Sequence, residues 1–167
     1  MRALLRLALL PLLLALGACG FKPLYGTNSM SAGVATELAS VAIAEPTTRL
    51  SQLIRNDLLS TMRPAGTAEP DRYVLTIDAK SNLDRALEDQ PTGENTRSTV
   101  RVNASFVLKD SATGKQVYSG KTFSNASFDE VGHSFANLQA QTNAVERAAH
   151  EISTDIQTRL AAYFASR

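Results

Sequence analysis

Cys19 is the residue whose position in this chain points most directly to chemistry, because it is the only cysteine and it follows an apolar run. The run extends from Leu7 to Ala18, comes after Arg2 and Arg6, and ends in the small pair Gly17-Ala18. A basic start, an apolar stretch of about 7 to 15 residues and small residues at its end are features of a cleaved signal peptide. A thiol placed directly after such a segment is a nucleophile that can take up a diacylglyceryl group. We therefore expect residues 1–18 to be removed and Cys19 to become a lipidated N-terminus.

The four residues Leu16-Gly17-Ala18-Cys19 resemble a lipobox, the site that a lipoprotein signal peptidase recognises. A membrane-spanning helix needs about 20 apolar residues, and the run is far shorter and contains Pro11. A plain secretory signal that is cut elsewhere remains open, although the position of the sole cysteine favours lipidation. We expect a diacylglyceryl group and an N-acyl chain such as palmitate on Cys19, and no other cofactor.

Composition limits the classes of function. Removal of residues 1–18 leaves 149 of the 167 residues, which suits one domain with its own core. Arg2 and Arg6 leave with that segment, so 15 basic residues remain against 16 acidic ones. This balance gives no reason to expect a nucleic-acid partner. Because lipidation uses the only thiol, the fold must be stable without disulfides.

The usual signs of catalysis are absent from the sequence. His133 and His150 are the only histidines, and neither has a second ligand at metal-binding spacing. The paired acids Glu88-Asp89 and Asp129-Glu130 fall in predicted loops, where carboxylates usually face water and keep ordinary pKa values. No serine lies in a Gly-x-Ser-x-Gly elbow. We expect a protein that is not an enzyme.

A row of basic residues is the other candidate for chemistry. Arg97, Arg101 and Lys109 share one parity along a predicted strand, and Lys80 lies on the preceding strand. Such a row could line an exposed sheet face and hold phosphate groups. An ordinary solvated sheet face would show the same pattern, so both interpretations stay open.

The elements that must position these residues follow from the periodicity of the apolar side chains. A short strand is expected over Leu38–Glu45, stopped before Pro46. An amphipathic helix should begin at Thr47 or Thr48 and end at Pro64. Alternating residues then predict three antiparallel strands, which are Tyr73–Lys80, Val100–Lys109 and Gln116–Ser124.

The sequence also makes predictions for the connections between the strands, and it leaves the orientation of the last strand undetermined. Residues Leu83–Arg97 are expected to form a long polar loop with a mobile tip, and Gly114 suits a turn position with positive φ. In the last strand Val117 and Phe123 share a face with Lys121, so the pattern does not say which side of this strand meets the helices.

A long helix over about residues 135–164 completes the order. The resulting fold class is α+β, with two helices packed on one face of a four-stranded, mostly antiparallel sheet. We expect a signal peptide over residues 1–18, a lipid anchor and flexible tether over 19–35, and the α+β domain over 36–167.

The start of the mature chain resembles a known family. The run Cys19-Gly20-Phe21-Lys22-Pro23-Leu24-Tyr25-Gly26 is similar to the opening of the LPS-assembly lipoprotein family LptE, in its alphaproteobacterial form. The hairpin around Asp110–Gly114 and the long last helix are similar to the same family. The resemblance covers essentially the whole mature chain.

This resemblance implies a non-enzymatic subunit of the outer-membrane LPS translocon. Such a subunit is anchored in the outer membrane by its lipid, faces the periplasm and the barrel lumen, and plugs the LptD barrel. It would also assist barrel assembly and LPS delivery, and bind LPS. The resemblance implies that the hairpin between the second and third strands faces LPS. The residues we expect to contact LPS are Arg85 and Arg97, the basic residues nearest that hairpin, and Arg101. The alternative is an accessory lipoprotein of an intermembrane lipid-transport or cell-wall-synthesis machine.

Overall fold

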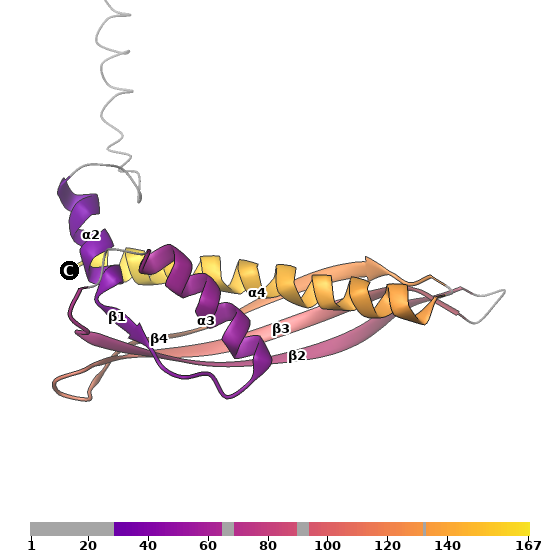
Figure 1. Cartoon of the computed structure of the whole chain (residues 1–167), viewed down its shortest axis with the longest axis horizontal. Helices are drawn as coiled ribbons and strands as arrows, with labels where there is room; N and C mark the ends of the chain where they lie inside the picture. The colour runs from indigo at the N-terminus through magenta and orange to yellow at the C-terminus, as the bar shows by residue number, and fades with distance from the viewer. Residues whose placement is uncertain (1–28, 65–68, 90–93, 132) are drawn as a thin grey trace, which may run out of the picture.

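The computed structural model describes residues 29–64, 69–89, 94–131 and 133–167 (Figure 1). The first 28 residues, which include Cys19 and the predicted signal peptide, lie outside the described part. Three helices lie on one side of a four-stranded sheet within that part. In chain order the elements are α2 (Ser29–Ala39), β1 (Val41–Ile43), α3 (Arg49–Met62), β2 (Tyr73–Asp89), β3 (Glu94–Asp110), β4 (Gln116–Asp129) and α4 (Ser134–Ala165). The predicted α+β class is confirmed, with one helix more than expected.

The sheet has the strand order β1-β2-β3-β4. The short β1 runs parallel to β2, and the other two pairings are antiparallel. Side chains alternate between the two faces of each strand, and those on the helix side form the core. Members of this core include Leu75 on β2, the even-numbered residues Val100 to Leu108 on β3, and Ala126 and Phe128 on β4.

The β2–β3 hairpin is longer than the sequence predicted. Residues Leu83–Arg97 were expected to be a loop, but β2 continues to Asp89 and β3 begins at Glu94. The ladder is irregular between Arg85 and Glu88 and remains paired beyond that point. Backbone pairing between the two strands therefore continues through this polar sequence.

Helix α3 begins as the sequence suggests. Thr48 is its N-cap, and the Thr48 hydroxyl accepts a hydrogen bond from the backbone N–H of Ser51 at 3.1 Å. The apolar side of α3 is buried through Leu50, Ile54, Leu58 and Met62.

Helix α4 is 32 residues long, which corresponds to about 48 Å, and it follows the length of the sheet. Its buried residues run from Ala144 to Phe164. Its first turns lie beyond this buried part and expose Phe135 and Leu138. No described helix combines the length and apolar character needed to cross a membrane.

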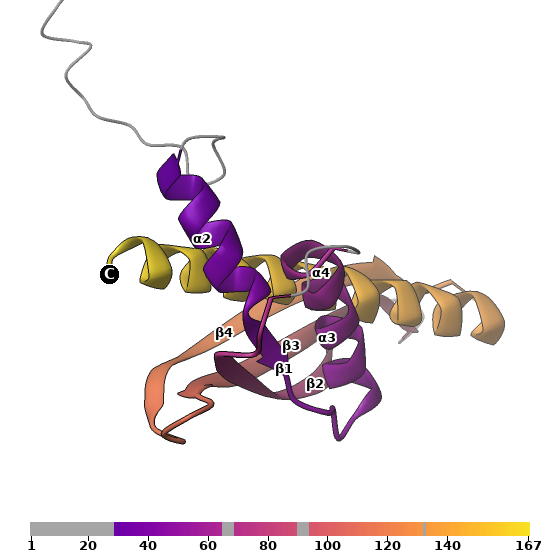
Figure 2. The ribbon, with the colours of Figure 1, turned by 60° about the vertical axis from the view of Figure 1, so that its left-hand side comes forward.

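Helix α2 differs from the sequence prediction. It begins inside the segment expected to be a tether, and it takes the first residues of the strand expected over Leu38–Glu45, which is reduced to β1. Val34 and Leu38 are buried, and α2 packs against the C-terminal part of α4 (Figure 2). An ion pair of 2.7 Å between Arg72 and Glu37 also ties α2 to the start of β2.

An aromatic cluster fills the core at the C-terminal end of α4. The Tyr118 and Tyr163 rings stack with 4.9 Å between centroids, and Phe106 lies 5.9 Å from Tyr118. Phe106 fits because its cross-strand partner is Gly120, which has no side chain to occupy the same space.

Candidate functional site

The sheet face opposite the helices is left uncovered by the other described elements (Figure 2). Strand alternation places polar and charged side chains on it. These are Thr76, Asp78, Lys80, Asn82 and Asp84 on β2, Arg97, Thr99, Arg101, Asn103, Ser105 and Lys109 on β3, and Ser119, Lys121, Asn125, Ser127 and Asp129 on β4. We call this surface the open face. The predicted parity of Arg97, Arg101 and Lys109 is confirmed, because all three lie on it and are exposed.

The two predicted arginines on the open face already have partners. Arg97 lies opposite Asp129, and its Nε is 3.2 Å from Asp129 Oδ1. Arg101 Nε donates to Asn125 Oδ1 at 3.1 Å and lies 3.8 Å from Asp84 Oδ2. All four charged side chains are about half exposed or more, so each ion pair contributes little to stability. The pairing does lower the net positive charge at these two positions.

Two predicted site residues cannot be compared in the same way. Arg85 lies on β2 in register with Ser98, and its side chain is outside the described side chains. Cys19 precedes the described residues. Their predicted roles in LPS contact and in lipid attachment therefore remain predictions.

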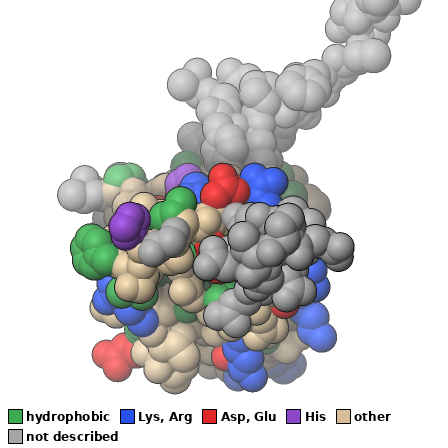
Figure 3. Space-filling view, turned by 90° about the vertical axis from the view of Figure 1, so that its right-hand side faces the viewer, with side chains coloured by type: hydrophobic (Ala, Val, Ile, Leu, Met, Phe, Trp, Pro, Cys, Tyr) green, Lys and Arg blue, Asp and Glu red, His purple; other side chains and the backbone are tan. Residues whose placement is uncertain are grey.

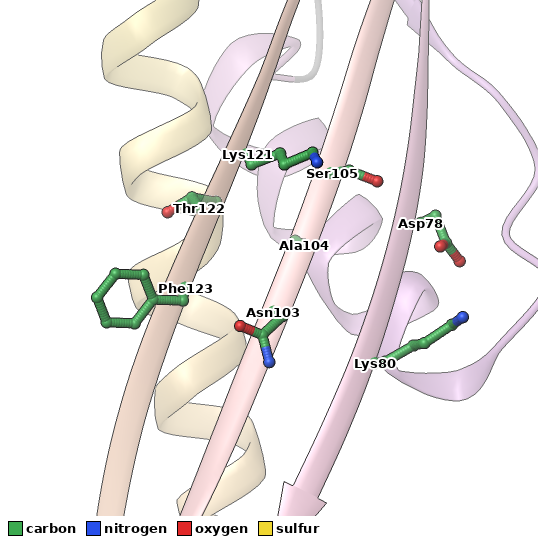
Figure 4. Close-up of a pocket in the computed structure, with 8 residues that line it drawn as sticks. All are labelled: Asp78, Lys80, Asn103, Ala104, Ser105, Lys121, Thr122 and Phe123. Carbon is green, nitrogen blue, oxygen red and sulfur yellow. The ribbon is translucent and has the colours of Figure 1, made fainter.

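A shallow hollow of about 300 Å³ lies in the middle of the open face (Figure 4). Two neighbouring cross-strand rows build it, namely Asp78–Ser105–Lys121 and Lys80–Asn103–Phe123. Figure 4 shows Asp78 and Lys80 on the β2 side, Lys121 reaching over β3 toward Ser105, and the Phe123 ring turned outward at the rim. The sequence did not single out Lys121 or Phe123, because the parity of β4 was undetermined.

The cations of the hollow differ from the arginines. Among the described residues, neither Lys80 nor Lys121 has an ion-pair partner within 4.0 Å. Phe123 is 67% exposed and is the one large apolar side chain of the open face among the strongly exposed residues that the structure describes. The hollow therefore combines two lysines without ion-pair partners, the Asp78 carboxylate, and amide and hydroxyl groups, with the Phe123 ring turned outward at its rim.

The turn between β3 and β4 joins two of the three strands that build the hollow. The Asp110 carboxylate accepts hydrogen bonds of 2.8 Å from both the backbone N–H and the hydroxyl of Thr113. These bonds hold the pKa of Asp110 below its ordinary value, and the bond from the backbone N–H of Thr113 has the larger effect. Gly114 has φ of 68°, the positive value expected for it from the sequence.

The described residues also show what the histidines and carboxylates do. No group of three or more metal-ligating side chains lies together in this part of the chain. His150 Nδ1 is 2.7 Å from Asp57 Oδ2, and the Ser153 hydroxyl donates to the same carboxylate oxygen. Because Asp57 lies on α3 and the other two lie on α4, this cluster joins two helices and has a structural role.

A second exposed feature lies where α4 begins. Val131, Phe135 and Leu138 are more than half exposed there. At this end of the molecule apolar, histidine and charged side chains are interspersed, without a continuous field of one charge (Figure 3).

Solved structures of lipoproteins resemble this fold. A lipoprotein from Caulobacter crescentus CB15 is 25% identical, with a TM-score of 0.67 over 81% of this chain and 98% of that one. Rare lipoprotein B from Shewanella oneidensis is 16% identical, with a TM-score of 0.55 over 74% of this chain and 92% of that one. A minor lipoprotein from Acinetobacter baumannii is 13% identical, with a TM-score of 0.53 over 74% and 89%. The last two similarities show the fold alone.

Sequence comparison identifies the family. No curated protein matches the chain in sequence. The family model described as LptE, lipopolysaccharide-assembly, matches residues 37–160, which is well over half of the chain. This match agrees with the resemblance carried by residues 19–26, which lie outside it, and the members of the family are lipoproteins without enzymatic activity. The chain therefore belongs to the LptE family of lipopolysaccharide-assembly lipoproteins.

Proposed function

We propose that this protein is the lipoprotein subunit of an outer-membrane LPS translocon. In this role it is anchored through a lipidated Cys19, stands inside the LptD barrel as a plug, assists the assembly of that barrel and contacts LPS during delivery. Family membership implies a part in lipopolysaccharide assembly. The observation that supports the finer assignment is the open face, a long polar surface on a domain whose other sheet face is covered by helices.

The composition of the open face fits the interior of a barrel. The lumen of a large outer-membrane barrel is lined by polar residues and filled with water. Side chains such as Asn82, Thr99 and Ser127 can hydrogen-bond to a polar wall, directly or through water, without a large cost of dehydration. Affinity then comes from area and shape, and an obligate interface of this kind buries on the order of 2,000 Å² or more.

The position of α2 is compatible with an N-terminal anchor. Cys19 precedes the first residue of α2, Ser29, by ten residues, and a chain of that length spans at most about 35 Å. Helix α2 packs at the end of the domain where α4 ends. The lipid would therefore hold the domain by this end.

Affinity purification tests the choice of partner. The full-length protein, tagged after Arg167, is purified from detergent-solubilised envelopes, and its stoichiometric partners are identified by mass spectrometry. We expect a large outer-membrane barrel protein in equal amount, together with LPS. Recovery of an inner-membrane transporter or a cell-wall synthase would replace this proposal with the accessory-lipoprotein alternative.

Depletion tests the function itself. We expect loss of the protein to leave the barrel misassembled and LPS retained inside the outer membrane, measured by barrel heat-modifiability and surface LPS labelling. Normal surface LPS after full depletion would refute the proposal.

Mass spectrometry of the membrane-bound protein tests the anchor. The expected N-terminal residue is an acylated Cys19. An unmodified N-terminus at any other residue would refute lipid anchoring and leave the plain secretory signal.

A further inference from the structure

We propose that the outer edge of β4, around Lys121, Phe123 and Asn125, pairs with an extended polypeptide segment of another protein, which adds a strand to the sheet. The segment runs antiparallel to β4, with an apolar residue opposite Phe123 and an acidic residue opposite Lys121. The inference goes beyond the proposed function and does not depend on it, because it concerns an edge of the sheet, whereas the proposed function concerns the open face.

The backbone groups of each strand alternate between its two sides, and the outer edge of β2 shows which residues point outward. There the Tyr73 N–H donates to the Ser40 carbonyl oxygen at 3.3 Å, and the Leu75 carbonyl oxygen accepts from the Ala44 N–H at 2.9 Å. Odd-numbered residues of β2 therefore point away from β3. In an antiparallel ladder, alternate residues bond to the neighbouring strand on one side and then on the other. Carried through the register of β2, β3 and β4, this alternation makes the odd-numbered residues of β4 point to the outer edge.

Two contacts at the end of β4 agree with this assignment. Arg147 Nη2 on α4 donates to the Ser127 carbonyl oxygen at 3.0 Å, so this carbonyl points away from β3. Thr99 Oγ1 and Ser127 Oγ are 2.8 Å apart, as expected for side chains of a directly opposed pair without backbone hydrogen bonds between its members. The outward direction of the odd-numbered residues of β4 thus follows from both edges of the sheet.

The middle of the β4 edge lacks the features that usually prevent strand addition. Edge strands are normally protected by several charges, by proline, by bulges or by a covering segment. Over Gln116–Phe128 the only charged residue is Lys121, and there is no proline. Among the described residues, Arg147 alone binds the backbone of β4 through its side chain, and it does so near the end of the strand. The backbone N–H and C=O groups of Lys121, Phe123 and Asn125 are therefore available for pairing.

The opposite edge of the sheet is protected. Strand β1 covers Tyr73–Leu75, and the part of β2 that follows contains Asp78, Lys80 and Asp84. Helix α3 also packs against β2. Because cover and charge are both present there, the inference concerns β4 alone.

The side chains of the outward residues indicate the chemistry of the added strand. Phe123 is 67% exposed, and an apolar residue directly opposite it would cover the ring. Lys121 has no ion-pair partner within 4.0 Å among the described residues, so an acidic residue opposite it would form a favourable cross-strand pair. Asn125 already accepts from Arg101 Nε at 3.1 Å and requires only a polar neighbour.

A second copy of this chain fits the edge poorly. Two β4 strands paired antiparallel would place both α4 helices on the same face of the joined sheet. Helix α4 packs more extensively on β4 than on any other strand, and Figure 4 shows it along the outer side of β4. Neighbouring strands lie about 4.8 Å apart, whereas packed helices need about 8–10 Å, so the two helices would collide. A single extended segment brings no helix and can lie over the outer side of α4.

The first test measures binding of a synthetic peptide to the full-length protein in detergent by fluorescence anisotropy. The peptide has eleven residues of serine and threonine, except for valine as the sixth and glutamate as the eighth. In the proposed pairing these two residues lie opposite Phe123 and Lys121, and their N–H groups face β4. Methylation of these two backbone nitrogens should weaken binding by at least about tenfold, because hydrogen bonds are lost. Methylation of the fifth and seventh nitrogens, which face away, should change it by less than twofold. Equal effects of the two methylations, or no binding of the unmethylated peptide, would overturn the inference.

A charge exchange tests the register. Wild-type protein should prefer the glutamate peptide over one with lysine at the same place by about fivefold, and Lys121→Glu should reverse this preference. The matched control is Lys115→Glu, which changes an exposed lysine in the turn before β4 and should keep the wild-type preference. The same preference in wild type and Lys121→Glu, or a reversal in the control, would overturn the register.

Amide hydrogen exchange and sedimentation identify the edge and its occupant. The N–H groups of Lys121, Phe123 and Asn125 should exchange at least tenfold more slowly once the peptide is bound, whereas those of Thr122 and Ser124, which face β3, should change little. Protection confined to other residues would overturn the proposed edge. The free protein should sediment as a monomer, and a dimer that the peptide dissociates would assign the edge to a second copy and overturn the inference.

Discussion

Replacement of Gly120 by alanine is expected to destabilise the domain, because the added methyl group would overlap the Phe106 ring. An ideal Cβ at position 120 lies 2.6 Å from Phe106 Cζ and 2.9 Å from Cε1. Carbon atoms pack at about 3.5–4.0 Å, so the methyl group is roughly 1 Å too close. Either the ring or β4 must move.

The surroundings of Phe106 set the magnitude. The ring is 1% exposed, the Tyr118 ring lies beside it in a tilted arrangement, and Tyr163 stacks on Tyr118. A ring enclosed in this way has no solvent into which it can withdraw. Overpacking of a well-filled core costs about 1–3 kcal/mol, which corresponds to a fall in Tm of about 3–10 °C for a domain of this size.

The assay is thermal and urea unfolding of the detergent-solubilised protein. Gly33→Ala is the matched control, since nothing lies within 4 Å of its Cβ and it sits in helix α2. It should raise stability by about 0.5–1 kcal/mol. Adding Phe106→Leu to Gly120→Ala should cost less than the sum of the two single changes, because the smaller side chain frees the space. A Gly120→Ala protein as stable as wild type would refute the argument.

Three smaller changes test the ends and turns. Thr48→Ala removes the acceptor for the Ser51 N–H and should cost about 1 kcal/mol, while Thr48→Asn should restore most of it; equal stabilities of wild type and Thr48→Ala would contradict the cap. Gly114→Ala should cost about 1–2 kcal/mol through its φ of 68° alone, and a gain in stability would show that the turn rearranges freely. Because the Thr113 hydrogen bonds lower the pKa of Asp110, its charged form stabilises the fold above the ordinary pKa of the carboxyl, and this contribution is lost as the pH falls through the lowered pKa. Asp110→Asn should therefore be less stable than wild type at pH 7, with the gap closing below about pH 4 in urea unfolding, and a gap independent of pH would exclude the charge as its cause.

Strand and helix patterns in the sequence predicted most of the fold because burial follows them. The alternation around Val100–Lys109 places every second residue in the core, and α3 begins at the threonine that can cap it. The long α4 buries one side through Ile152, Ile156 and Leu160. Each of these elements has one buried face and one solvent-exposed face, and the periodicity of apolar residues reveals this arrangement.

The two elements that differ from the prediction lack a clear periodic pattern of apolar and polar residues. Helix α2 consists largely of small residues with weak amphipathicity, and it is stabilised by Val34 and Leu38 packing on a helix more than 100 residues later in the sequence. The far end of the β2–β3 hairpin is polar and is held by backbone pairing across Asp84–Thr99 and Arg85–Ser98. The local sequence pattern cannot predict either the packing of α2 on α4 or the pairing of two polar strands, because both depend on residues distant in the sequence.

Parity along one strand placed Arg97 and Arg101 on the open face correctly, yet it could not show that they face acids on neighbouring strands. That information depends on the register of three strands, which sets Arg97 against Asp129 and brings Asp84 to Arg101. The same register decides that Lys121 points away from the helices and shares the hollow with Lys80.

The basic residues of the open face therefore fall into two groups that the sequence alone does not distinguish. In the described part of the chain, the arginines form ion pairs across the strands, and the lysines do not. Paired arginines fix the cross-strand arrangement at low energetic gain, and their removal should alter local order more than ligand affinity. Lys80 and Lys121 have no ion-pair partner among the described residues, so their charge is available to a ligand. Because the ion-paired arginines and the unpaired lysines lie on the same surface, unfolding and binding assays on arginine and lysine variants separate the structural role of this charge from its availability to a ligand.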